Sequence, residues 1–149
     1  YLSDVARLEW AYHVAFHAAE CAHLDVTGLH QVGEERYPDL VFSLNPASQL
    51  LASPYPVLAI WQANQEDATN TDSGIDLDSG GARLLVIRRN RQVEFESLSH
   101  GEYEFLDALA QGKNFTAACE LALQAEPEFS VDHCFQKHVQ TKTIIDFSI

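Results

Sequence analysis

The sequence feature that most constrains the fold is a strand at 83–89 that is apolar on both faces. Its centre is an unbroken apolar run: Leu84, Leu85, Val86 and Ile87. A strand of this kind lies at the centre of a sheet. Asn90-Arg91 follows where a tight hairpin turn fits, because Asn tolerates the positive φ that such turns need. Residues 92–98 then alternate, with Val93 and Phe95 on one side, as in a half-solvated antiparallel strand.

Three helices are predicted after this hairpin. Ser99 stands three residues before Glu102, a capping box that begins the first helix, which ends at Gly112. Its inward residues are Phe105, Leu106 and Leu109. A second helix spans 115–124, and Ser130 caps a third. The inward face of the third consists of Cys134, Phe135, His138 and Val139. Residues 143–149 are predicted to finish the chain as a strand.

The first half is mainly helical in this interpretation. Residues 3–22 repeat apolar side chains every three or four positions, with Ser3 or Asp4 as the cap. The remaining predictions are a helical turn near 26–31, a strand at 40–44, a helical turn at 48–52 and a helix at 57–65 that begins beside Pro56. A short edge strand is expected at 75–78.

The predicted fold class is therefore α+β. Residues 1–65 form a mainly helical docking region, and the acidic segment 66–81 is a linker. Residues 82–149 form a domain whose order, an antiparallel hairpin and three helices, resembles both a winged helix and the PqqD-type peptide-recognition domain.

Charge and composition weigh against several classes of function. The formal net charge is −13, which opposes binding to nucleic acid or anionic membranes because phosphate attraction needs clustered Lys and Arg. Three widely spaced cysteines favour reduced thiols in the cytoplasm over a disulfide framework. No apolar run is long enough to span a bilayer. The chain contains no Met, and we expect it to be part of a longer protein.

Two segments carry a family resemblance. Val5–Ala11 reads VARLEWA, and Tyr55–Asn64 reads YPVLAIWQAN. Both resemble the HvfC/BufC-type family, whose members often carry a DNA-binding label. Proteins of that family accompany a multinuclear iron enzyme that modifies cysteines in ribosomally made, metal-responsive peptides. The resemblance implies a non-catalytic scaffold subunit that presents a precursor peptide to its iron-enzyme partner, with the iron chemistry belonging to the partner.

The resemblance and the hairpin together suggest two binding modes. A guest peptide could add a strand to the edge at 92–97. The residues expected to contact it are Val93, Phe95, Phe135 and Val139. The alternative is a transcription regulator whose arginine cluster contacts DNA phosphates: Arg88, Arg89 and Arg91. Arginines that only keep a sheet edge soluble explain the cluster equally well. Three aromatic residues are candidate anchors for a partner: Trp10, Tyr55 and Trp61.

Metal binding and catalysis receive little support from the sequence. The metal candidates are four apart on the first helix: Glu9, His13, His17 and Cys21. One helical His pair does not fill a tetrahedral shell, so a groove or interface role is favoured there. Cys134 and His138 also share a helix face, interpreted as core packing. No nucleophile elbow, phosphate loop or dinucleotide-binding glycine pattern occurs, so neither a cofactor nor an enzymatic activity is expected.

Overall fold

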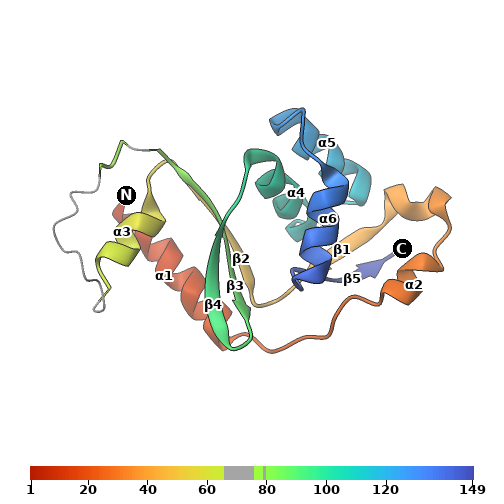
Figure 1. The fold of residues 1–149 in the computed structure, drawn as a ribbon, viewed down its shortest axis with the longest axis horizontal. Helices are drawn as coiled ribbons and strands as arrows, with labels where there is room; N and C mark the ends of the chain where they lie inside the picture. The colour runs from red at the N-terminus through yellow and green to blue at the C-terminus, as the bar shows by residue number, and fades with distance from the viewer. Residues whose placement is uncertain (66–75, 79) are drawn as a thin grey trace.

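The structure is a computed structural model that describes residues 1–65, 76–78 and 80–149 (Figure 1). It confirms a mixed α+β fold. The elements in chain order are α1 (Leu2–His17), α2 (Val26–His30), the 3-10 helix η1 (Glu34–Asp39), β1 (Val41–Leu44), β2 (Ser48–Ser53), α3 (Val57–Ala63), β3 (Ala82–Arg89), β4 (Gln92–Ser97), α4 (His100–Ala110), α5 (Phe115–Ala125), α6 (Val131–Gln140) and β5 (Ile144–Ser148).

A three-stranded antiparallel sheet with the order β2-β3-β4 forms the centre of the molecule. The prediction that β3 is the central strand is confirmed. The predicted hairpin is confirmed as well, because Arg89 pairs with Gln92 across a two-residue turn. Asn90 and Arg91 in this turn have φ values of 52° and 70°. Both values match the positive φ that a tight hairpin turn requires at its two central residues.

The two faces of β3 are buried in two separate clusters. Leu84 and Val86 belong to a cluster with α1, whereas Leu85 and Ile87 belong to a cluster with α4, α5 and α6. All four side chains are at most 1% exposed. Figure 1 shows the corresponding layers, with α1 and α3 on one side of the sheet and α4, α5 and α6 on the other. The sheet is therefore the middle layer of three.

A second, two-stranded sheet joins distant parts of the chain. β1 pairs antiparallel with β5, so the last strand is paired with residues 41–44 and not with the hairpin. Likewise, β2 supplies the third strand beside β3. Both sheets thus contain strands from each side of 66–81. That segment lies mostly outside the described residues, and the division of the chain there stays a prediction.

Three local predictions were wrong, and a fourth was wrong in its described part. Residues 48–52 form β2 rather than a helical turn, because pairing with β3 outweighs local preference. The first helix ends at His17 and not at 22, and Ala18 is already extended with ψ 149°. No cap side chain precedes α1, which begins at Leu2. Of the predicted strand at 75–78, Ile75 lies outside the described residues and Leu77 lies in a turn.

The C-terminal helices agree with the sequence in their boundaries and buried faces. Ser99 accepts a hydrogen bond from the backbone N–H of Glu102, and Ser130 accepts one from that of His133. Gly112 ends α4 with a φ of 82°, a conformation that favours glycine. The buried residues of α4 include Phe105, Leu106 and Leu109, and those of α6 are Cys134 and His138. None of the helices in the described part of the chain combines the length and apolar character needed to cross a membrane.

Candidate functional site

The outer edge of β4 contains two of the predicted peptide-binding residues, Val93 and Phe95. The backbone N–H of Leu98 donates to Arg83, so the even-numbered residues of β4 bond to β3. By antiparallel geometry, the backbone groups of Val93, Phe95 and Ser97 point away from β3. Within the described residues no strand pairs with this edge. Its N–H and C=O groups are therefore in position to bind another extended chain.

The side chains of Val93 and Phe95 pack toward α1. Both are half-buried against the cluster that contains Leu84 and Val86. The Phe95 ring lies 4.9 Å from that of Trp61 and 6.1 Å from that of Tyr12, measured between centroids. These rings contact Phe95 from α3 and α1. Phe95 therefore belongs to the packing between sheet and helix.

Charged residues occupy the opposite face of β4, beside α6. Lys137 Nζ forms ion pairs with Glu96 and, at 3.2 Å, with Glu102. Burial by itself would lower the pKa of Lys137, but the hydrogen bond to Glu96 and the charge of Glu102 outweigh it and raise that pKa. Arg89 pairs with Glu94 at 3.0 Å and with Glu96 at 3.6 Å. This ion-pair network connects α6 to the sheet along β4.

Phe135 and Val139 lie on the other side of α6, away from β4. Both pack against the cluster that contains Leu85 and Ile87. Phe135 also lines an apolar pocket of about 250 Å³. The other lining residues are Leu29, His30, Tyr37, Leu40, Phe42 and Phe115. The four predicted peptide-contacting residues are thus not brought together: two face α1, and two face the C-terminal core.

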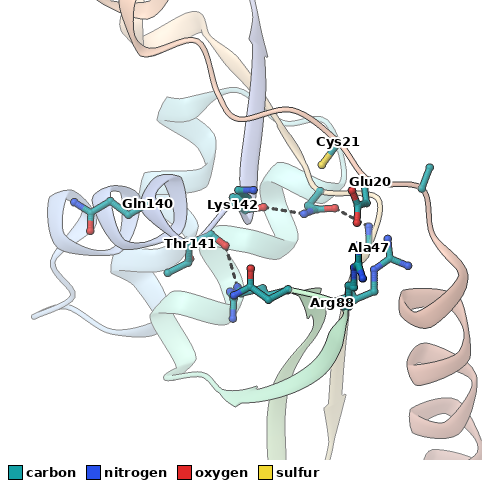
Figure 2. A pocket seen from close by; sticks show the side chains of 12 residues that line it. Glu20, Cys21, Ala47, Arg88, Gln140, Thr141 and Lys142 are labelled. Carbon is teal, nitrogen blue, oxygen red and sulfur yellow. Dashed lines mark hydrogen bonds between the residues drawn. The ribbon is translucent and has the colours of Figure 1, made fainter.

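The predicted arginine cluster lines a separate pocket of about 460 Å³ (Figure 2). Arg88 donates to the backbone oxygen of Phe16 at 2.6 Å and to that of Ala18. These carbonyls end α1, where a cation is favourable because it complements the helix dipole. Arg89 donates to the backbone oxygen of Thr141 at 2.9 Å. Figure 2 shows Arg88 and Thr141 among the residues that line this pocket.

Two of the three candidate phosphate-binding arginines therefore have internal acceptors. The Arg89 side chain is only 18% exposed, and its guanidinium pairs with both Glu94 and Glu96. Arg91 is exposed in the hairpin turn. Lys142 lines the same pocket. An anionic partner at this pocket would have to compete with carbonyl and carboxylate oxygens that already accept from Arg88 and Arg89.

The three candidate anchor residues have different environments. Trp10 on α1 is 67% exposed, and its ring stacks on His13 at 5.6 Å. Tyr55 and Trp61 are half-buried in the cluster beneath α1. Ring contacts continue from His13 to His17 at 4.4 Å and from His17 to Phe16 at 5.0 Å. We call Trp10, His13, Phe16 and His17, all exposed, the α1 aromatic surface.

The four metal-ligand candidates predicted on the first helix do not all lie on it. Because α1 ends at His17, Cys21 lies in the extended segment that follows and lines the arginine pocket. Glu9, His13 and His17 remain on α1 and are exposed. Among the described residues, the group of three donors that lie close together is a different one: Glu102, Cys134 and His138.

This donor cluster was missed because it depends on how α4 docks against α6. The sequence places Cys134 and His138 on one helix face and Glu102 in a capping box. Ser99 does cap α4, but the Glu102 carboxylate accepts from Lys137 instead. It lies 3.6 Å from Nε2 of His138. The sequence contains two signals for this cluster. One is a glutamate in the first turn of a helix, and the other is a Cys-x-x-x-His on another helix.

Known proteins give no direct guide to this site. No protein-family model, no curated protein and no solved structure matches the chain.

Proposed function

We propose that this chain is a non-catalytic accessory subunit that binds a precursor peptide and docks on an iron-dependent peptide-modifying enzyme in the cytoplasm. The observation that carries the proposal is the outer edge of β4, which has no strand partner within the described residues. The resemblance of the segments 5–11 and 55–64 to HvfC/BufC-type proteins supports the same role. The order hairpin, α4, α5, α6 supports a winged-helix or PqqD-like recognition unit.

The guest binds as an added antiparallel or parallel strand. Its backbone pairs with the outward-facing groups of Val93, Phe95 and Ser97, and main-chain hydrogen bonds supply most of the affinity. Guest side chains on one face meet the aromatic packing around Phe95. Those on the other face meet Glu94 and Glu96, which are already paired with Arg89 and Lys137. Arg88 and Arg89 donate to internal acceptors, so neither is free to attract acidic residues of a guest.

The α1 aromatic surface is the docking site for the enzyme. It lies on the opposite side of the sheet from α6 (Figure 1). Exposed Trp and Phe side chains supply large contact areas at interfaces, and Trp10 and Phe16 are 67% and 51% exposed. Peptide and enzyme then bind the same molecule at separate sites. Tethering raises the concentration of the peptide at the active site of the enzyme.

Ser97→Pro tests the strand-addition mode. Ser97 is exposed and its N–H points outward, so proline removes an edge donor and blocks approach without removing a bond to β3. The probe is a synthetic Cys-rich peptide of the class that such an iron enzyme would modify. We expect calorimetric binding to wild type and to the matched Ser97→Ala control, and loss of binding to Ser97→Pro.

Three results would count against the proposal. If Ser97→Pro and Ser97→Ala bind the peptide equally well, the outer edge of β4 is not the peptide-binding site. If neither the peptide nor the enzyme binds the wild-type chain at micromolar concentration, the proposed accessory role is refuted. Salt-dependent binding of duplex DNA that is lost in an Arg91→Ala variant would favour the transcription regulator instead.

A further inference from the structure

A compact set of metal-ligand donors lies between α4 and α6, on the face of α6 that packs inward. Glu102, Cys134 and His138 each offer one donor atom, and these atoms all lie within 4.8 Å of one another. Cys134 and His138 are 2% and 0% exposed, and the Glu102 side chain is 13% exposed. The three residues come from two helices, so their convergence is a property of the tertiary structure.

Thr143 connects His138 to the surrounding hydrogen bonds. Arg89 Nη2 donates to Thr143 Oγ1, and Thr143 Oγ1 lies 3.0 Å from His138 Nδ1. A proton on Nδ1 would donate to Thr143 Oγ1, and the neutral imidazole would then have a lone pair on Nε2.

That lone pair lies in an unfavourable environment without a further cation. Nε2 of His138 is buried and finds no hydrogen-bond partner among the described residues. Its nearest charged neighbour is Glu102 Oε2 at 3.6 Å, too long for a hydrogen bond. A lone pair facing a carboxylate oxygen is repulsive, and a buried unsatisfied polar atom costs roughly 1–3 kcal/mol. A positive ion between the two atoms would satisfy both.

We propose that Glu102, Cys134 and His138 bind one divalent metal ion of the Zn²⁺ class. A thiolate, an imidazole nitrogen and a carboxylate oxygen are ligands that Zn²⁺ takes in proteins, with the fourth tetrahedral position left outside this set. The Nδ1 contact to Thr143 is the outer-shell hydrogen bond that typically orients a ligating histidine. Lys137 also donates to Glu102 Oε1, at 3.3 Å, so it can stay in contact when Oε2 binds the ion.

Proton release accompanies binding at this site. Burial, together with the charge of Glu102, raises the pKa of the Cys134 thiol to about 12, so the thiol is protonated before the ion arrives. Formation of the sulfur–metal bond displaces that proton to solvent, with no change in oxidation state. The affinity therefore increases as the pH rises. The ion would join α4 to α6 independently of any peptide at β4.

Titration of the full, chelator-treated chain with Co²⁺ tests the site. We expect one Co²⁺ per chain, a sulfur-to-cobalt charge-transfer band, proton release in weakly buffered solution, and displacement by Zn²⁺. Cys134→Ser should abolish the band. The matched control is Cys119→Ser, which removes a half-buried free thiol on α5 and should leave the band unchanged. Thr143→Val should weaken binding about 10–100-fold, and Thr143→Ser should not.

Several results would overturn the proposal. One is a folded chain that fails to bind Zn²⁺ or Co²⁺ at micromolar concentration, which would indicate an imidazolium–carboxylate pair instead. The others are a band that survives Cys134→Ser and a band that is lost in Cys119→Ser. If circular dichroism shows that Cys134→Ser is unfolded, the Zn²⁺ affinity of Glu102→Gln tests the site instead. A loss of more than about tenfold in Zn²⁺ affinity supports the site, and unchanged affinity refutes it.

Discussion

Replacing Arg88 by Met removes the two hydrogen bonds that its guanidinium donates to the end of α1 but keeps most of its aliphatic stem. The acceptors are the backbone oxygens of Phe16 and Ala18. Hydrogen bonds to charged groups contribute about 1.5–3 kcal/mol each, and partial exposure reduces this. We expect a total loss of about 1.5–3 kcal/mol in the free energy of unfolding. For a chain of this size, that lowers the melting temperature by roughly 3–12 °C.

The matched control is Arg91→Met in the same hairpin. Arg91 is exposed, and its side chain forms no hydrogen bond within the described residues, so we expect a change below about 0.5 kcal/mol. Urea denaturation followed by tryptophan fluorescence and circular dichroism measures both variants. If Arg88→Met is as stable as Arg91→Met, the hydrogen bonds from Arg88 do not stabilise the end of α1.

Three further predictions concern the core, pH and thiol reactivity. Leu85→Ala should cost about 2–5 kcal/mol in urea denaturation because Leu85 is fully buried; a loss below 1 kcal/mol, roughly that of a surface change, would contradict this. The hydrogen bond from Ser53 lowers the pKa of Asp4 below 3.8, so its stabilising contribution is present above that value and lost as the pH falls through the folded pKa. Asp4→Asn should therefore flatten the acid side of the stability–pH curve, and an unchanged acid side would refute the role of this contact. Alkylation followed by mass spectrometry should modify partly exposed Cys21 before Cys134, whose thiol is buried with a pKa of about 12; the reverse order would be inconsistent with the burial of Cys134.

Features that depend on neighbouring residues could be predicted from the sequence. The hairpin is one, because an apolar run, a turn-forming Asn and an alternating strand lie next to one another. The caps at Ser99 and Ser130 are others, since each side chain bonds a backbone N–H three residues later. The inward faces of α4 and α6 were predictable for the same reason, because helical spacing alone determines which side chains share a face.

Features that depend on distant residues could not be predicted. Residues 48–53 are a strand because β3 pairs with them, and nothing within that segment indicates the partner. α1 ends where Arg88, some 70 positions away, donates to its last carbonyls. The donor cluster arises only when α4 packs against α6. The packing of α1 and α3 over Phe95 likewise depends on residues far from it in the sequence.

Interleaved pairing makes a strong prediction about the isolated segment 82–149. Without the preceding residues, β3 loses β2 and the Leu84 and Val86 side chains lose the cover of α1. β5 loses β1 as well. Removing full burial from two such side chains alone costs about 3–6 kcal/mol, a large share of the stability of a typical domain. We expect the segment to show no cooperative thermal transition by circular dichroism. A cooperative transition at the midpoint of the full chain would instead establish residues 82–149 as an independent domain, and the two-sided burial of β3 would then contribute little to its stability.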